Sequence, residues 1–90
     1  MEKVVITITG KDKTGIVAKI TNVLAKNNVN IIDIRQSIME GLFTMIMLVD
    51  ISTSEKDFED IEDNLSSVGN EIGVKVVVQH ENIFKYMHRI

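Results

Sequence analysis

The spacing of apolar residues along this chain alternates between the two-residue period of strands and the longer period of helices. Apolar and polar residues alternate over residues 3–9, 29–39 and 74–79, whereas residues 42–51 are apolar on both faces. Two stripes at helical spacing predict helices with these buried residues: Ile16, Val17, Ile20, Val23 and Leu24 in the first, and Phe58, Ile61, Leu65, Val68 and Ile72 in the second. The predicted order is strand, helix, strand, strand, helix, strand.

Residues that favour turns and helix caps indicate where these elements end. We expect Gly10 to end the first strand and Asn27 and Asn28 to close the first helix, because asparagine tolerates the left-handed conformation found at helix ends. The run 52–54, Ser-Thr-Ser, offers N-caps for the second helix, which Gly69 is expected to loosen and Gly73 to end. These signals place the boundaries between the six elements.

The order of elements consists of two successive split βαβ units. Right-handed crossovers then give an α+β, ferredoxin-like βαββαβ sandwich, a four-stranded antiparallel sheet with two helices on one face. The strand over residues 42–51, apolar on both faces, falls in the interior of that sheet. The fold leaves the second sheet face open. Either Phe43, Met45, Met47 and Val49 or the residues on the other face of the same strand therefore meet water, and an exposed apolar patch of that size usually marks an interface.

The size of the chain also favours an interface with a partner. A domain of ninety residues is only marginally stable as an isolated monomer, and without cysteine no disulfide can reinforce it. We therefore expect oligomerisation. We expect residues 1–80 to form the domain, and residues 81–90 to form a tail that packs as a short helix or extended arm on the domain or on a partner subunit. Apolar residues recur in this tail, namely Phe84, Tyr86, Met87 and Ile90.

Charge and hydropathy limit the partners. The net charge is −3, and six of the 13 acidic residues lie between Glu55 and Asp63, where they are typical of the solvated face of one helix; a docking patch for a basic partner is the alternative. The short apolar stretch Val4–Ile6 is too short for a signal peptide or a membrane span. We therefore expect a cytoplasmic protein that binds neither nucleic acid directly nor a membrane.

Several functions known for this topology lack their residues here. RNA recognition needs aromatic residues along the central strands, which carry only Phe43. The first loop holds neither the paired cysteines of copper chaperones nor an arginine for phosphate, and residues 10–15 lack the Lys-Ser/Thr of a P-loop. His80, His88 and Glu81 have no recognisable metal-site spacing. We therefore predict no catalytic residues, no metal site and no cofactor.

The polar loop before the first helix is the best candidate site. Backbone N–H groups at a helix N-terminus suit a carboxylate, Gly15 lets a ligand approach the backbone closely, and Asp12 offers a partner for an amino group. This loop could therefore hold both ends of a free amino acid. Asp12 and Thr14 are both residue types that cap helices, and the alternative stays open that Asp12 merely caps the helix and Gly15 merely turns the chain.

The same residues resemble a known family. The motif Asp12-Lys13-Thr14-Gly15-Ile16-Val17, after the strand VVITITG, resembles the opening of ACT domains, which are small modules that bind amino acids and regulate metabolic enzymes. The segment 29–34 resembles the start of their second strand. The tail 83–90 is similar to the ending of stand-alone single-ACT-domain proteins of uncharacterised function. More distantly, the chain is similar to the N-terminal part of the glycine cleavage system transcriptional repressor.

The resemblance implies a ligand site between two subunits. Asp12, Thr14, Gly15 and Ile16 of one chain would surround the ligand, and Asn30 of the neighbouring chain would reach it. ACT domains often pair edge to edge or pack face to face. We therefore expect a non-enzymatic homodimer or tetramer that binds an amino acid and acts on a separate protein. The alternatives are a ligand-free dimeric interaction module or subunit of a larger complex and, less favoured, an enzyme.

Overall fold

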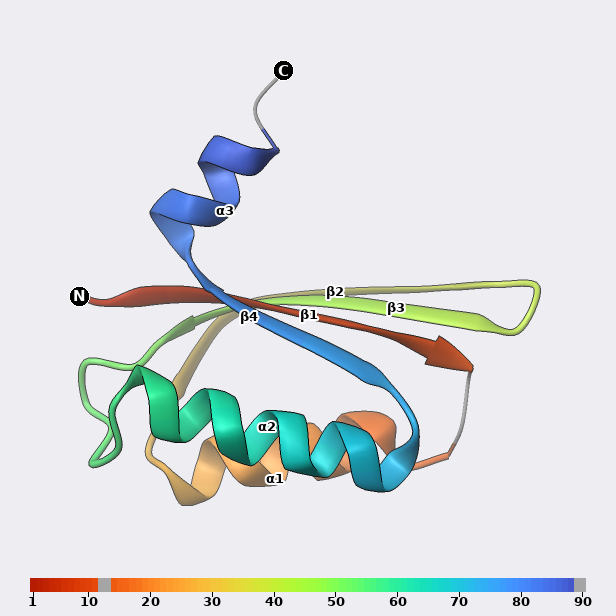
Figure 1. Cartoon of the computed structure of the whole chain (residues 1–90), viewed down its shortest axis with the longest axis horizontal. Helices are drawn as coiled ribbons and strands as arrows, with labels where there is room; N and C mark the ends of the chain where they lie inside the picture. The colour runs from red at the N-terminus through yellow and green to blue at the C-terminus, as the bar shows by residue number, and fades with distance from the viewer. Residues whose placement is uncertain (12–13, 89–90) are drawn as a thin grey trace.

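The computed structural model describes residues 1–11 and 14–88, which form one four-stranded sheet and three helices. The elements are β1 (Lys3–Lys11), α1 (Ile16–Lys26), β2 (Asn30–Met39), β3 (Leu42–Asp50), α2 (Phe58–Ile72), β4 (Lys75–His80) and α3 (Glu81–Met87). All neighbouring strands are antiparallel, in the order β2-β3-β1-β4, and α1 and α2 cover one face (Figure 1). The predicted ferredoxin-like fold is confirmed.

The core lies between the sheet and the two long helices. Along β1 and β3, every second residue points towards the helices and is buried, and these residues face one another in the pairs Val4–Val49, Ile6–Met47 and Ile8–Met45. The helices contribute Ile16, Ile20 and Leu24 from α1 and Ile61 and Leu65 from α2. The other stripe residues, Val17, Val23, Phe58, Val68 and Ile72, are partly buried against this core.

The first strand is longer than predicted. Gly10 does not end β1 but pairs with Phe43, and the strand continues to Lys11. A Cβ atom on Gly10 would lie 2.9 Å from Val74 Cγ1, so the glycine serves close packing here. The glycine therefore marks a tight contact between segments that are distant in sequence.

The cap of α2 also differs from the prediction. The N-cap is Asp57, whose side chain accepts a hydrogen bond from the Asp60 N–H at 3.0 Å, and not a residue of the run 52–54. Those three residues form the turn before the helix; the Thr53 hydroxyl, for example, donates to the Asn28 carbonyl at 2.9 Å. Gly73 ends α2 with a φ of 78°, as predicted, and Asn27 caps the end of α1.

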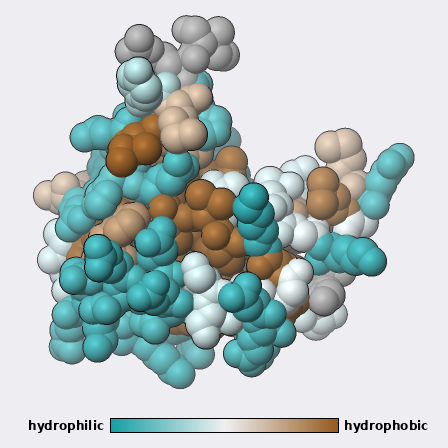
Figure 2. Space-filling view, viewed as in Figure 1, coloured by the Kyte–Doolittle hydropathy of each residue, from teal (hydrophilic) through white to brown (hydrophobic). Residues whose placement is uncertain are grey.

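The sheet face opposite α1 and α2 is only partly covered. Leu42 and Ile46 are exposed there, so the residues that meet water are the opposite set to the buried Phe43, Met45, Met47 and Val49. The tail forms the helix α3 on this side, where it stands over one end of the sheet and buries none of its own residues (Figure 1). Figure 2 shows hydrophobic side chains gathered across the sheet between the hydrophilic surface of α2 and the region of α3.

No helix in the described parts of the chain combines the length and the apolar character needed to cross a membrane.

Candidate ligand site at the start of α1

The first turn of α1 begins at a glycine in a conformation that other residues rarely adopt. Gly15 is the N-cap with φ 91° and ψ 0°, and its carbonyl accepts the first helical hydrogen bond from the Lys19 N–H at 3.0 Å. Among residues 1–11 and 14–88, a Cβ atom built on Gly15 would meet nothing within 4 Å. The left-handed backbone, and not crowding, is therefore what requires glycine here, and the space beside it is open.

The N–H groups that follow Gly15 belong to the first turn of α1 and have no acceptor within the helix. Among the described residues, no side chain accepts a hydrogen bond from the N–H of Ile16, Val17 or Ala18. Thr14, which was a candidate cap, is exposed in the turn and does not fill this role. Together with the positive end of the helix dipole, these N–H groups form a site suited to a carboxylate.

The four predicted site residues that the structure describes do not gather in one chain. Thr14, Gly15 and Ile16 are consecutive at the start of α1, and Ile16 offers only its backbone because its side chain is in the core. Asp12 lies outside the described residues. Asn30 is exposed at the start of β2, beyond the opposite end of α1. An 11-residue helix is about 16 Å long, so Asn30 of the same chain is far from Gly15.

A shallow groove separates α1 from the beginning of β2. Its lining residues are Ala18, Thr21, Asn22 and Ala25 from the outer side of α1, and Val29, Asn30 and Ile31 from the entry into β2. The side chains from α1 are small or polar, which leaves this side of the helix without a bulky covering. The sequence prediction did not include this groove, because it depends on how α1 lies relative to β2.

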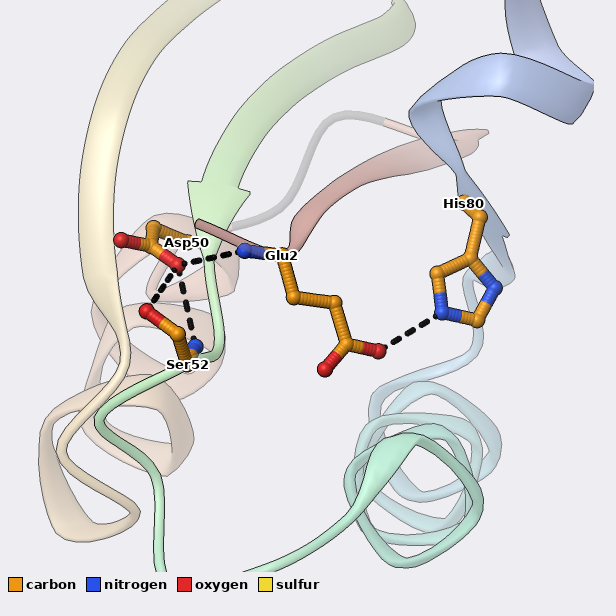
Figure 3. Close-up of polar contacts among 4 residues, drawn as sticks. All are labelled: Glu2, Asp50, Ser52 and His80. Atoms are coloured by element: carbon orange, nitrogen blue, oxygen red, sulfur yellow. Dashed lines mark hydrogen bonds and ion pairs between the residues drawn. The ribbon is translucent and has the colours of Figure 1, made fainter.

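A polar cluster that the sequence prediction missed joins the ends of three strands (Figure 3). Asp50 Oδ1 accepts hydrogen bonds from the Ser52 hydroxyl at 2.7 Å, the Ser52 N–H at 2.9 Å and the Glu2 N–H at 3.2 Å. The Ser52 hydroxyl, followed by these two N–H groups, holds the pKa of Asp50 below its ordinary value. The Asp-x-Ser sequence after a strand is typical of such a turn and was the available signal.

The same cluster includes one of the two histidines. His80 Nε2 lies 2.8 Å from Glu2 Oε2, and its ring stacks on Phe58 with the ring centroids 4.3 Å apart. His88 is the C-cap of α3, where its ring stacks on Phe84. Within residues 1–11 and 14–88, no group of three or more acidic, histidine or cysteine side chains is arranged to hold a metal ion. The described cluster thus joins strand ends and provides no metal site.

Comparison with known proteins identifies the family. A family model of the ACT domain matches residues 2–79. The chain belongs to the ACT-domain family. This ACT domain is 67% identical over 90 residues to a UPF0237 protein of Methanococcus maripaludis, and the match covers 100% of each chain. It is also similar to an ACT domain protein from Streptococcus pneumoniae, with a TM-score of 0.80, 36% identity, and coverage of 93% of this chain and 94% of the other.

A more distant similarity confirms the remaining part of the predicted resemblance. The ACT domain matches the crystal structure of a putative glycine cleavage system transcriptional repressor with a TM-score of 0.75 and 25% identity, covering 88% of this chain and 45% of the other. ACT domains are typically regulatory modules that bind amino acids, and no catalytic function is indicated for the UPF0237 relatives. The comparisons thus support a regulatory class.

Proposed function

We propose that this protein is a homodimeric regulatory ACT protein that binds a free amino acid and acts on a separate protein. The observation that carries the proposal is the open N-terminus of α1. Gly15 holds the backbone in the left-handed conformation, with open space beside it, and the following N–H groups have no side-chain acceptor among the described residues. An α-carboxylate matches these donors in charge and in geometry.

Each proposed site residue has a distinct part. The N–H groups of Ile16 and Val17 receive the carboxylate, and Thr14, exposed in the turn, lies beside it. The family resemblance places Asp12 beside the ligand, where its carboxylate would receive the amino group. A second subunit is required because Asn30 of the same chain lies beyond the far end of α1, whereas the partner's Asn30 can complete the site.

Calorimetric titration with each of the common amino acids at millimolar concentration tests this function. We expect at least one amino acid to bind the wild type, and we expect binding to weaken in Gly15→Ala, because alanine disfavours the φ of 91° and so distorts the first turn of α1. Gly41→Ala is the matched control. Gly41 also has a positive φ, 82°, and open space beside it, but it lies in the β2–β3 turn, so this variant should bind normally.

Two results would contradict the proposal. Absence of binding to the wild type would reject amino acid sensing, and equal weakening in both glycine variants would show that the effect is not specific to α1. A ligand-free interaction module is favoured by the exposed apolar residues of the open sheet face. An interaction module predicts no heat of binding with any amino acid. It also predicts a partner protein that, once purified, binds this chain equally well with and without amino acids.

A further inference from the structure

Helix α3 covers only one end of the sheet face opposite α1 and α2. Val5 points to this face, because its neighbours Val4 and Ile6 are buried towards the two long helices, yet Val5 is only 5% exposed. Gln79, which is opposite Val5 in the sheet, donates from Nε2 to Met87 Sδ of α3 at 3.3 Å. α3 therefore lies over this end of β1 and β4, as Figure 1 shows.

The rest of this face becomes more exposed with distance from α3. In the next row of the register, Ile46 and Val77 are 38% and 36% exposed, and at the far end of the sheet Leu42 and Met39 are 51% and 69% exposed. We call the face from that row to the far end the open patch, which in β1 runs from Thr7 to Lys11. An exposed apolar surface of this kind usually marks an interface.

The charged residues of the open patch all have the same sign among the described residues. Arg35 on the edge strand β2, Lys75 on the edge strand β4 and Lys11 at the end of β1 are exposed at its rim. Asp33 is on the same face but outside the patch, and its Oδ2 lies 3.6 Å from Arg35 Nη2. The patch is therefore basic although the chain has a net charge of −3, and it complements an acidic partner.

We propose that the open patch docks an amphipathic helix of a partner protein, with an apolar stripe flanked on both sides by Asp or Glu. The stripe would lie along the two central strands, over Ile46 and Leu42, and the flanking carboxylates would pair with Arg35 on one edge and Lys75 on the other. The inference rests on the proposed function only for the existence of a separate partner protein. It names the surface that the partner contacts and the chemistry of the segment that binds.

The dimensions of the open patch fit one helix. Neighbouring strands lie about 4.8 Å apart, so the two edge strands of this four-stranded sheet are separated by about 14 Å. A helix with its side chains is about 10–12 Å wide, which places its two flanks near β2 and β4. Along β1, the patch from Thr7 to Lys11 is about 13 Å long, which corresponds to about nine helical residues.

Two other occupants match the open patch less well. A second copy seated on it by its own open patch would bring cations against cations, and such an arrangement is destabilising. A single-stranded nucleic acid would find cations but no aromatic side chain on which its bases could stack. Phe43, the only phenylalanine, tyrosine or tryptophan of the four strands, is buried on the opposite face. An acidic amphipathic helix uses both the apolar and the charged residues.

A synthetic helical peptide with a leucine stripe flanked by glutamates, and its counterpart with lysine in place of glutamate, test the docking by fluorescence anisotropy without any amino acid present. We expect the wild type to bind the glutamate peptide. Arg35→Glu combined with Lys75→Glu should raise the dissociation constant for this peptide at least about tenfold and should bind the lysine peptide instead. Lys26→Glu combined with Lys56→Glu makes the same change in net charge at exposed positions outside the patch and should bind like the wild type.

The exchange of preference distinguishes a changed surface from a misfolded variant, because a misfolded variant would bind neither peptide. Absence of binding to the wild type, or equal weakening in both double variants, would overturn the docking site. Tighter binding of a short oligouridine than of the peptide would instead indicate a nucleic-acid surface and also overturn it. A second copy on this face is indicated if the patch variant alone changes self-association in sedimentation equilibrium, and this result contradicts the proposal as well.

The docking and the proposed function can fail separately. If the glutamate peptide binds as expected but calorimetry finds no amino acid that binds, the docking site stands and amino acid sensing is wrong. If an amino acid binds but the peptide does not, the ligand of the proposed function stands and the docking site is wrong.

Discussion

The contact between α2 and β4 depends on a single glycine, and replacing it gives the sharpest test of the packing. Gly69 is buried inside α2, and a Cβ atom there would lie 2.6 Å from Val76 Cγ2 and 3.0 Å from the Val74 carbonyl oxygen. The Val74 N–H also donates to the Gly69 carbonyl at 2.9 Å, so this backbone cannot easily move away. Gly69→Ala must therefore push the helix and the strand apart.

The expected change in the free energy of unfolding is the cost of overpacking less the gain in helix propensity. Overpacking of a core costs about 1–3 kcal/mol, and a clash with backbone belongs at the upper end of that range. Alanine recovers about 1 kcal/mol over glycine in helix propensity. The net loss is about 2 kcal/mol, which for a domain of this size lowers the melting temperature by about 8–16 °C.

Thermal unfolding followed by circular dichroism measures this loss, with all variants at one protein concentration because self-association changes the melting temperature. Asn70→Ala is the matched control, since Asn70 is the next residue of α2 and is exposed. It should gain up to about 0.7 kcal/mol from helix propensity alone. If Gly69→Ala melts at or above the wild-type temperature, the close approach of α2 to β4 is wrong.

Three further predictions concern the caps, the polar cluster and the tail. Asp57→Ala removes the α2 cap and should cost about 1 kcal/mol in thermal unfolding at neutral pH. The pKa of Asp50 is lower in the folded than in the unfolded protein, where it is about 4, so ionised Asp50 stabilises the fold above that pH. This contribution is lost as the pH falls through the folded pKa. Ser52→Ala should therefore lower the melting temperature at pH 7 but not at a pH below both pKa values, which a series of melting curves against pH measures. Deleting residues 84–90 should change the melting temperature or the dimer dissociation constant, and no change in either would rule out a packing role.

Most of the fold could be predicted because it depends on local patterns. The alternation in β1 and the stripes of α1 and α2 each follow from one-sided burial, and one-sided burial is visible in the order of residues. The alternation predicted over residues 29–39 agrees with the register of β2 and β3, which places Ile34 and Ile38 on the opposite sheet face to Asp33 and Arg35. Ile32 lies at an irregularity of the pairing. These features need no knowledge of distant residues.

The errors share a different physical origin. Gly10 was expected to end a strand, but it is needed where Val74 approaches β1, and Gly69 is needed where Val74 and Val76 approach α2. A glycine required by a close approach and one required by a turn look alike in sequence. The cap at Asp57 was missed for a similar reason, because several serine, threonine and aspartate residues precede α2 and the local sequence does not rank them.

The candidate site was predictable only in part. The loop residues Thr14, Gly15 and Ile16 follow from local sequence, since a helix start with a glycine is a local feature. The relation of Asn30 to that loop depends on a second subunit, and the Asp50 cluster depends on the ends of three strands meeting. Neighbouring residues encode only the Asp50–Ser52 turn of that cluster. The contact of Asp50 with Glu2 and that of Glu2 with His80 join residues that are distant in sequence.

An amino acid bound at the start of α1 between two subunits would change the surroundings of residues from both chains. Chemical-shift mapping of the isotope-labelled protein, during titration with the amino acid that calorimetry identifies, tests it directly. We expect large shifts of the backbone N–H signals of Gly15, Ile16 and Val17 and of the Asn30 side chain, with little change around His80. Shifts confined to the His80 end of the sheet, or no shifts at millimolar ligand, would contradict binding at the start of α1.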